Sequence, residues 1–169
     1  MSAEVVIRTA RPADLPDLQR VYRESSLSNV DDRENLLTHP EYLIFAGSGI
    51  TSGRTTVALV DGRVVGFASV VESDVKQLEL EDLFVDPGWQ RRGIARRLVA
   101  DLVQTAHRNG FRTIVVTGNA HAKAFYLAVG FVEFGEEATQ FGPAPRFRLD
   151  TTSSAADLLT EPSGPAEAV

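Results

Sequence analysis

The sequence predicts one α/β (α+β) domain, in which a mixed, mostly antiparallel, twisted sheet of six to seven strands is flanked by about four helices. Three observations support this fold class. Short runs rich in β-branched residues recur along the chain, and two of them flank the glycine turn Asp61-Gly62-Arg63. Two amphipathic helical segments follow, each ended by a Gly-Phe pair. The length of 169 residues suits one domain with a single core.

The N-terminal half is predicted to contain a strand, two helices and a hairpin, in that order. Residues 5–9 alternate between apolar and polar side chains, as a half-buried strand does. A helix is predicted over residues 12–24, where apolar residues recur at helical spacing, and a shorter one over 31–39, ended by Pro40. Residues 55–60 and 64–71 then form the two strands of the hairpin.

The C-terminal half is predicted to place two helices between strands. The predicted strands are residues 75–85, 113–117, 131–134 and 141–149. The predicted helices are residues 94–109 and 120–129. Each helix is followed by glycine and phenylalanine, at Gly110-Phe111 and Gly130-Phe131, an order typical of the Schellman motif with a left-handed glycine.

The domain is expected to occupy residues 1–149. From residue 150 to residue 169 the composition shifts to Ser, Thr, Ala, Pro and acidic residues. Such a segment buries little apolar surface, so we expect a disordered tail that is dispensable for chemistry.

The composition excludes several classes of site. With 43% hydrophobic and 24% charged residues, it is ordinary for a soluble globular protein. The chain has no cysteine, and its three histidines lack metal-ligand spacing, so no metal site is predicted. No apolar run approaches the roughly 20 residues of a membrane span, and the start lacks a signal-peptide pattern. We therefore expect a cytoplasmic protein with no membrane partner.

The net charge of −6, from 17 basic and 23 acidic side chains, argues against nucleic acid as a partner. The arginines around Gly93 then form a local basic island, which suits a small anionic cofactor. The acidic remainder is compatible with a cationic amine acceptor, and equally with a role in solubility alone.

A short basic turn between a strand and a helix is the first candidate binding site. The strand closes at Asp86-Pro87-Gly88, and Gln90-Arg91-Arg92-Gly93-Ile94-Ala95 leads into the helix. The first N–H groups of a helix and its dipole favour anions, glycine lets the backbone approach, and arginine pairs with phosphate oxygens. By itself, Arg-Arg-Gly is more typical of a solvated turn, so the turn needs a second signal.

A second segment supplies that signal, and with it the chain resembles the GCN5-related N-acetyltransferase (GNAT) superfamily. This family carries a Gln/Arg-x-x-Gly-x-Gly/Ala turn after its fourth strand, then an Asn, an Ala-x-x-Phe-Tyr and a Gly-Phe after its fifth. The matching residues are Gln90, Gly93, Ala95, Asn119, Ala122, Phe125, Tyr126, Gly130 and Phe131. The start, Ile7-Arg8-Thr9-Ala10 and Pro12-Ala13-Asp14, is also similar, so the resemblance covers about residues 4–149. Ala95 stands where glycine is commoner.

The resemblance implies an N-acetyltransferase that moves the acetyl group of acetyl-CoA to a primary amine by direct attack in a ternary complex. It also implies that strands four and five splay and that the cosubstrate, with no metal, enters the gap. The implied cofactor residues are Leu83, Phe84 and Val85 for the pantetheine amides, Gln90, Arg91, Arg92, Gly93, Ile94, Ala95 and Arg96 for the pyrophosphate, and Asn119, Ala122, Phe125 and Tyr126 beside the pantetheine.

Two glutamates on the fourth strand are candidates to take the proton of the amine, whose free pKa is about 10.4. Strict alternation predicts that Glu79, Glu81, Leu83 and Val85 share one face, with Asp82 on the other. Glu81 is the first candidate for the proton relay and Glu79 the second. Acidic residues on a half-exposed strand are also often solvated or paired with arginine.

Tyr126 is the candidate general acid for the departing CoA thiolate, since a phenol with pKa near 10 can donate to a thiol of pKa about 8.5. The alternative is that Phe125 and Tyr126 are only helix core. Asn119 is predicted to cap the helix that starts at residue 120.

The acceptor is not specified by the sequence. By resemblance, residues 25–42 and a loop over 137–146 flank the acceptor side. Candidate pocket residues are Tyr22, Asp31, Asp32, Glu34 and Phe45, all of which can also be ordinary core or exposed residues. Small amines and protein amines stay open as acceptors, monomer and homodimer stay open as assemblies, and the alternative function is a non-catalytic acyl-CoA-binding or sensing module. A Rossmann or P-loop nucleotide site is excluded, because neither glycine motif is present.

Overall fold

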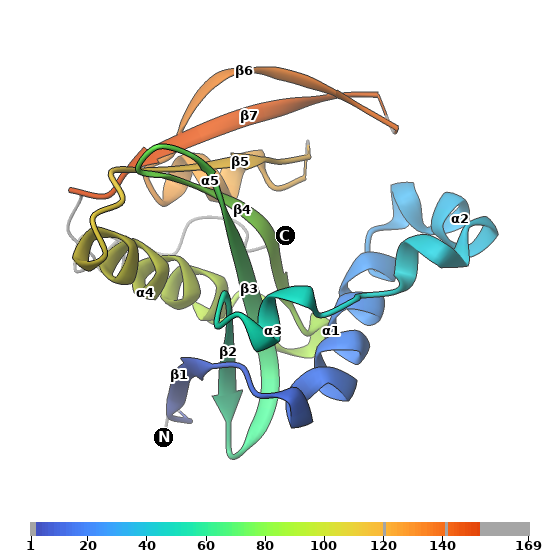
Figure 1. The fold of residues 1–169 in the computed structure, drawn as a ribbon. Coiled ribbons are helices and arrows are strands. Elements are labelled where there is room, and N and C mark those ends of the chain that lie inside the picture. Colours follow the sequence, from blue (N-terminus) through green and yellow to red (C-terminus); the bar gives the residue numbers. More distant parts are fainter. Residues whose placement is uncertain (1–2, 120, 141, 153–169) are drawn as a thin grey trace.

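The computed structural model describes residues 3–119, 121–140 and 142–152. They form a seven-stranded sheet in the order β1-β2-β3-β4-β5-β7-β6 (Figure 1). The strands are β1 (Val5–Thr9), β2 (Thr55–Val60), β3 (Arg63–Asp74), β4 (Gln77–Val85), β5 (Thr113–Thr117), β6 (Val132–Thr139) and β7 (Gly142–Asp150). Only β4 and β5 pair in parallel, which confirms the predicted mixed, mostly antiparallel sheet.

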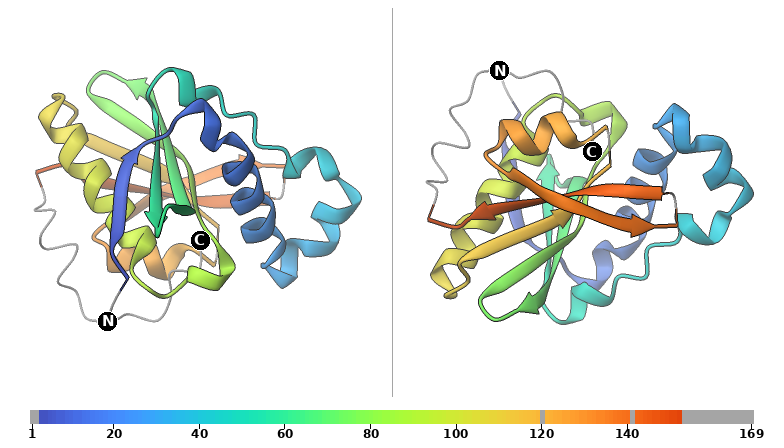
Figure 2. Two further views of the ribbon diagram at one scale, coloured as in Figure 1. Left: turned by 90° about the horizontal axis from the view of Figure 1, so that it is seen from below. Right: turned by 90° about the horizontal axis from the view of Figure 1, so that it is seen from above.

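Helices cover both faces of the sheet. They are α1 (Leu15–Leu27), α2 (Val30–Thr38), α3 (Ser48–Thr51), α4 (Ile94–Arg108) and α5 (Lys123–Ala128). In the view from below, α1 and α4 stand on opposite sides of the central strands (Figure 2). One buried cluster joins α4 and α5 to one face, and a second joins α1 to the other. The predicted apolar stripe of α4 is confirmed, with Ile94, Leu98 and Val103 almost fully buried.

The sheet divides where β4 and β5 stop pairing. Their ladder runs from Gln77 opposite Thr113 to Leu80 opposite Val116. Beyond it, β4 continues along β3 to Val85, whereas β5 stays with β7. The predicted splay of the fourth and fifth strands is therefore confirmed.

A β-bulge at Glu81 coincides with the splay and corrects the predicted face of Glu79. Ser69 of β3 pairs with Asp82, but the next β3 residue pairs with Leu80, so Glu81 is an extra residue on β4. Strict alternation placed Glu79 on the same face as Leu83, and this is wrong. Because the bulge inserts one residue, the core side chains are Leu78, Leu80, Leu83 and Val85. Glu79 and Asp82 therefore share the opposite face, on the side of α1.

Local signals at the turns and helix ends are confirmed where the chain is described. Asp61 and Gly62 both have positive φ, as a two-residue hairpin turn with native twist requires. Both Gly-Phe pairs form Schellman motifs, in which Phe111 N donates to Ala106 O at 2.9 Å and Phe131 N to Tyr126 O at 2.9 Å.

Several element boundaries differ from the prediction. The first helix opens as a 3-10 turn (Pro12–Asp14), and α1 then runs past the predicted end at residue 24. The last helix starts at Lys123 instead of 120, because Asn119 Oδ1 accepts from Ala122 N at 2.8 Å and occupies the turn before the helix. Positions 120 and 141, within predicted elements, lie outside the described residues, as does most of the predicted tail.

The predicted loop over 137–146 is instead mostly a β-hairpin. β6 extends to Thr139 and β7 begins at Gly142, and the two strands pair from Gly135 opposite Arg146 to Thr139 opposite Gly142. Pairing with β7 outweighs the weak strand propensity of Gly135, Glu136 and Glu137, since strand formation depends on neighbours. The hairpin reaches toward α2 (Figures 1 and 2). Among the described residues, no helix is long and apolar enough to cross a membrane.

We expect Gly66→Val to destabilise the protein by about 1–3 kcal/mol through overpacking. A Cβ at Gly66 would lie 3.0 Å from Ile94 Cγ2 and 3.1 Å from Phe84 O, so a side chain there pushes α4 away from β3. Urea denaturation measures the loss. Gly135→Val is the matched control, because an added Cβ meets no atom within 4 Å in that exposed strand. Equal stability of the two variants would contradict the close packing of α4 on β3.

Candidate active site

The divergence of β4 and β5 opens a cavity of about 520 Å³. Its walls come from β4, from β5 and the turn after it, from α2, from α5, and from the end of the β6–β7 hairpin. The lining residues are Asp32, Leu36, Leu80, Glu81, Leu83, Phe84, Val116, Thr117, Gly118, Asn119, His121, Ala122, Tyr126, Thr139, Gly142, Pro143, Ala144 and Pro145. The lining is mostly apolar, with carboxylates at Asp32 and Glu81.

A second cavity of about 460 Å³ adjoins the first. The two share the lining residues Asp32, Leu36, Phe84, Asn119 and His121. The remaining walls are the segment from Ser25 to Asp31 and the turn residues Gln90 and Arg91. The two cavities therefore form one groove, which runs from the β6–β7 hairpin to the basic turn.

The basic turn has the backbone geometry of an anion site. Arg91 and Gly93 both adopt left-handed φ, at 64° and 83°. That conformation is natural for glycine and unfavourable for arginine, so the turn holds Arg91 in a strained state. Alternation of conformations in such a turn directs successive N–H groups to one side. The 15-residue helix α4 starts directly after Gly93 and adds the positive end of its dipole.

The predicted cofactor residues divide into those that line the groove and those that do not. Leu83, Phe84, Gln90, Arg91, Asn119, Ala122 and Tyr126 line it. Val85, Arg92, Gly93, Ile94, Ala95, Arg96 and Phe125 are not among the lining residues of either cavity. The side chains of Ile94, Ala95 and Phe125 lie in the core, so their predicted contribution is limited to backbone groups. Arg92 instead covers the ring of Trp89, 4.8 Å from its centroid.

Tyr126 is held rigidly at the wall of the first cavity. Its ring lies 5.3 Å from the ring of Phe131 and 5.4 Å from that of Phe147. Gly118 is confined beside it, because a Cβ there would lie 2.9 Å from Phe147 Cε2 and 3.3 Å from Tyr126 Cε2. Burial raises the pKa of the Tyr126 hydroxyl well above its ordinary value. The hydroxyl therefore stays protonated and can act as a hydrogen-bond donor.

Glu79 is engaged with an arginine from β7. Arg146 Nη1 donates to Glu79 Oε1 at 2.6 Å and to Thr117 Oγ1 at 2.8 Å, while Thr117 donates to Glu137 Oε2 at 2.7 Å. Glu79 Oε2 is buried and has no hydrogen-bond partner in the described part of the chain. Glu79 lines neither cavity and is paired with arginine, which is the alternative to a proton-relay role that the sequence left open.

The two other carboxylates of β4 lie in contrasting surroundings. Glu81, at the bulge, is exposed and lines the first cavity. Asp82 is mostly buried on the α1 side, opposite Ser69, whose Oγ lies 3.0 Å from Thr55 Oγ1. Burial, helped by the charge of Glu81 and opposed by a hydrogen bond from Ser69, raises the pKa of Asp82 to about 6. Burial and the charge of Asp82 also raise the pKa of Tyr22.

The predicted acceptor residues are only partly brought together. Asp31 and Asp32 line the groove, and Asp31 Oδ2 lies 3.3 Å from Nε2 of His121 on the opposite side. Glu34 is exposed outside both cavities. Tyr22, on α1, and Phe45 pack in the aromatic cluster between α1 and the sheet, where Tyr22 donates to Tyr42 O at 2.8 Å.

Comparison with known proteins identifies the family. The model of the acetyltransferase (GNAT) family matches residues 16–131, more than half of the chain. The chain belongs to the GNAT acetyltransferase family. It is an N-acetyltransferase, and the resemblance drawn from its two motifs is confirmed.

Relatives of this acetyltransferase include bacterial proteins of similar length. An uncharacterized N-acetyltransferase of Mycobacterium tuberculosis is 29% identical over 142 residues, which are 82% of this chain and 88% of that protein. The N-alpha-acetyltransferase RimI of the same species is 35% identical over 77 residues, 44% of this chain and 49% of RimI.

Solved structures share the fold at low identity. An N-acetyltransferase from Staphylococcus aureus matches with a TM-score of 0.67 and 20% identity, over 88% of this chain and 99% of that one. The PaiA N-acetyltransferase from Thermoplasma acidophilum, crystallised with coenzyme A, matches with a TM-score of 0.68 and 18% identity, over 87% and 99% of the two chains.

Sequence reasoning missed two features of the acetyltransferase site. The Arg146–Glu79 pair joins residues 67 positions apart, and no local pattern signals it. The burial of Asp82 depends on the bulge at Glu81, which interrupts the alternation. A signal was present, since Leu78, Leu80, Leu83 and Val85 can all be apolar core only if one residue between Leu80 and Leu83 is skipped.

We expect Asp82→Asn to stabilise the protein at pH 8 and to change little at pH 4. The folded-state pKa of about 6 lies above the ordinary 3.8, so wild-type stability falls as pH rises through this range and Asp82 ionises. At pH 8 the ionised, buried Asp82 carboxylate lowers the free energy of unfolding by up to about 3 kcal/mol, and asparagine avoids this cost.

Urea midpoints at pH 4 and pH 8 measure this difference. Asp61→Asn, in the exposed β2–β3 turn, is the control for the same exchange of a carboxylate for an amide outside the core. A loss of stability in Asp82→Asn at pH 8 would contradict the burial of an ionised carboxylate.

Proposed function

We propose that this N-acetyltransferase uses acetyl-CoA to acetylate a primary amine of a small molecule, a peptide or a protein, by direct attack in a ternary complex. The observation that carries the proposal is the continuous groove between the splayed strands and the basic turn. A thioester at the splay and a pyrophosphate at the turn would occupy the two ends of that groove. A panel of amines, assayed for release of free CoA thiol, tests the activity and finds the acceptor.

The coenzyme fits the groove through backbone groups and charge. On the side of β5, no described strand pairs with β4 beyond Leu80, so Leu83, Phe84 and Val85 can pair with the pantetheine amides as an added strand would. Arg91 and the start of α4 would hold the pyrophosphate. The PaiA relative crystallised with coenzyme A supports this coenzyme for the fold.

In the proposed reaction, the neutral amine attacks the thioester carbonyl, a C–N bond forms, and the C–S bond then breaks. A backbone N–H of β4 polarises the thioester oxygen as charge develops on it. Glu81 receives the amine proton, directly or through water, because its carboxylate is exposed at the cavity wall. Glu79 is the second choice, since Arg146 occupies one of its oxygens and neutralises its charge.

Tyr126 would stabilise the departing thiolate. Its raised pKa makes complete proton transfer to a thiolate of pKa about 8.5 unfavourable, so the hydroxyl acts chiefly as a hydrogen-bond donor. Contacts with the rings of Phe131 and Phe147 fix the position of the Tyr126 ring. The proton of the amine can then reach the thiolate through water after the C–S bond has broken.

Gly93→Asp should abolish the thermal stabilisation of the protein by acetyl-CoA. The substitution adds a side chain at φ 83° and a negative charge where the pyrophosphate would bind. Gly110→Asp is the control, because it places the same residue at φ 85° at the other end of α4. Retention of the acetyl-CoA shift in Gly93→Asp would refute the phosphate-binding role of the turn.

Tyr126→Phe should lower kcat by roughly 10²–10³, the loss expected for one preorganised hydrogen-bond donor, and leave the KM for acetyl-CoA almost unchanged. The ring and its packing stay, and only the donor to the thiolate is lost. Steady-state kinetics with any amine that the wild type acetylates measure the effect. Tyr22→Phe, a tyrosine outside both cavities, serves as the control. Full activity in Tyr126→Phe would mean that the thiolate leaves unaided or by way of water.

A further inference from the structure

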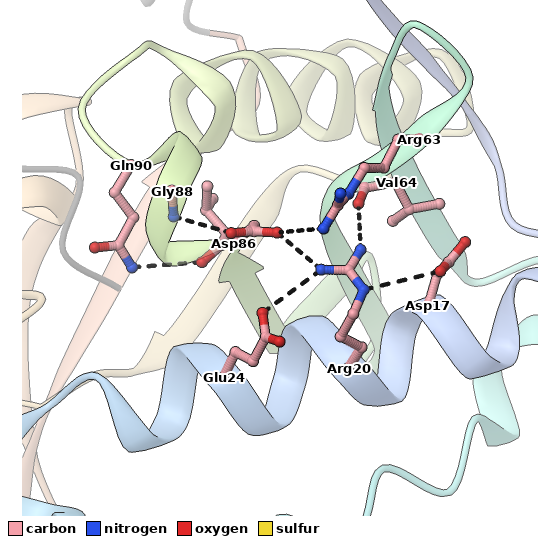
Figure 3. A network of polar contacts seen from close by, with 9 residues as sticks. Asp17, Arg20, Glu24, Arg63, Val64, Asp86, Gly88 and Gln90 are labelled. Carbon is pink, nitrogen blue, oxygen red and sulfur yellow. Dashed lines mark hydrogen bonds and ion pairs between the residues drawn. The ribbon is translucent and has the colours of Figure 1, made fainter.

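An ion pair joins α1 to the base of the basic turn (Figure 3). Arg20 Nη1 lies 2.8 Å from Asp86 Oδ2 and donates a hydrogen bond to it. The two residues are 66 positions apart, so the pair fixes the relative position of two distant segments. Their side chains are only 26% and 10% exposed. Such a partly buried pair, with additional hydrogen bonds, is less screened by solvent than a surface pair.

Asp86 uses its other polar atoms to shape the turn. Its Oδ1 accepts from Gly88 N at 2.9 Å, and its carbonyl oxygen accepts from Trp89 N at 2.8 Å. Its own N–H donates to Val65 O at 2.8 Å. The carboxylate therefore holds the 3-10 turn Pro87–Trp89 with one oxygen and α1 with the other.

The guanidinium of Arg20 also makes two hydrogen bonds, one to Asp86 and one to Val64. Its Nη2 donates to Val64 O at 2.9 Å, so the guanidinium connects α1 to the start of β3 as well as to the end of β4. The neighbouring charges are farther away, with Glu24 at 3.6 Å and Asp17 at 3.9 Å from Arg20, and Arg63 at 3.8 Å from Asp86. These three side chains are at least half exposed, so the short Arg20–Asp86 pair is the strongest ion pair of the network.

The pair joins two segments that each contribute residues to the wall of the second cavity. Ser25, on the same helix as Arg20, lines one wall. Gln90, four residues after Asp86, lines the other, and its Nε2 donates to Val85 O at 3.4 Å. A shift of Asp86 relative to α1 would therefore change both the separation of the walls and the direction of the turn that carries Arg91.

We propose that Arg20 and Asp86 are a positioning pair that holds the basic turn in the conformation that binds the coenzyme pyrophosphate. The inference rests on the proposed acetyl-CoA function, and it adds two residues that contact neither the acyl group nor the acceptor. They act through the Gly88 N–H and the path of the chain to Arg91.

The proposal is tested with two acetyl donors, one that contains the pyrophosphate and one that lacks it. Acetyl-CoA carries this group, whereas S-acetylpantetheine has the same thioester and amides without it. Dissociation constants are measured for both ligands in the wild type, Asp86→Asn and Arg20→Met. Trp89, the single tryptophan of the chain, lies at the turn and provides an intrinsic fluorescence signal. Asp86→Asn keeps an oxygen that can accept from Gly88 N, so the turn keeps its cap while the ion pair is lost.

The expected result is selective weakening of acetyl-CoA binding. Its Kd should rise about tenfold in either variant, and the double variant should show less than the product of the two effects, because both remove one interaction. The Kd of S-acetylpantetheine should stay unchanged. Arg20→Lys should give an intermediate value, because an ammonium can pair with Asp86 but cannot reproduce the fork that also reaches Val64 O.

Arg63→Met is the matched control for net charge. It removes a positive charge that approaches the same Asp86 oxygen from an exposed position, and both dissociation constants should stay at wild-type values. Equal weakening of the two ligands in Asp86→Asn and Arg20→Met would show a general structural role and overturn the proposal, as would unchanged binding of acetyl-CoA. A wild type that binds acetyl-CoA no better than S-acetylpantetheine would overturn the phosphate-binding turn itself, and this inference with it.

Discussion

The end of the β4–β5 ladder is the constraint on which the groove depends. The two strands pair up to Leu80, and beyond it β4 continues along β3 as its one partner among the described strands. The bulge at Glu81 lies at this point, and bulges bend a strand and increase its twist. One extra residue therefore separates the strands, exposes a backbone edge to a ligand and places a carboxylate at the mouth of the gap.

The bulge also distributes three neighbouring carboxylates among three environments. Glu79 is paired with Arg146, Glu81 faces the cavity, and Asp82 is buried on the α1 side, where its pKa is raised to about 6. Residue type alone does not distinguish these side chains. Their different contacts leave Glu81 as the carboxylate that is both unshielded and next to the proposed reaction site.

The basic turn combines local and distant interactions. Locally, the left-handed conformations of Arg91 and Gly93 and the start of α4 form the proposed anion site on an otherwise acidic protein. At a distance, the Arg20–Asp86 pair connects this turn to α1, the helix that leads into α2. The Arg20–Asp86 pair therefore connects the wall of the groove at the turn to the wall formed by α1 and α2.

Much of the architecture could be predicted from the sequence because its causes are local. Hydrophobic periodicity located β1 and α4, and a short β-branched run located β5. The glycines ended α4 and α5, and the two motifs around Gly93 and Tyr126 indicated the family that the comparisons confirmed. The tertiary structure decided which face of β4 each carboxylate occupies. A bulge reverses the alternation and depends on pairing with β3, and the partners Arg146 of Glu79 and Arg20 of Asp86 come from elements far away in the chain. Such contacts form only when the whole sheet is assembled, so no pattern along the chain specifies them.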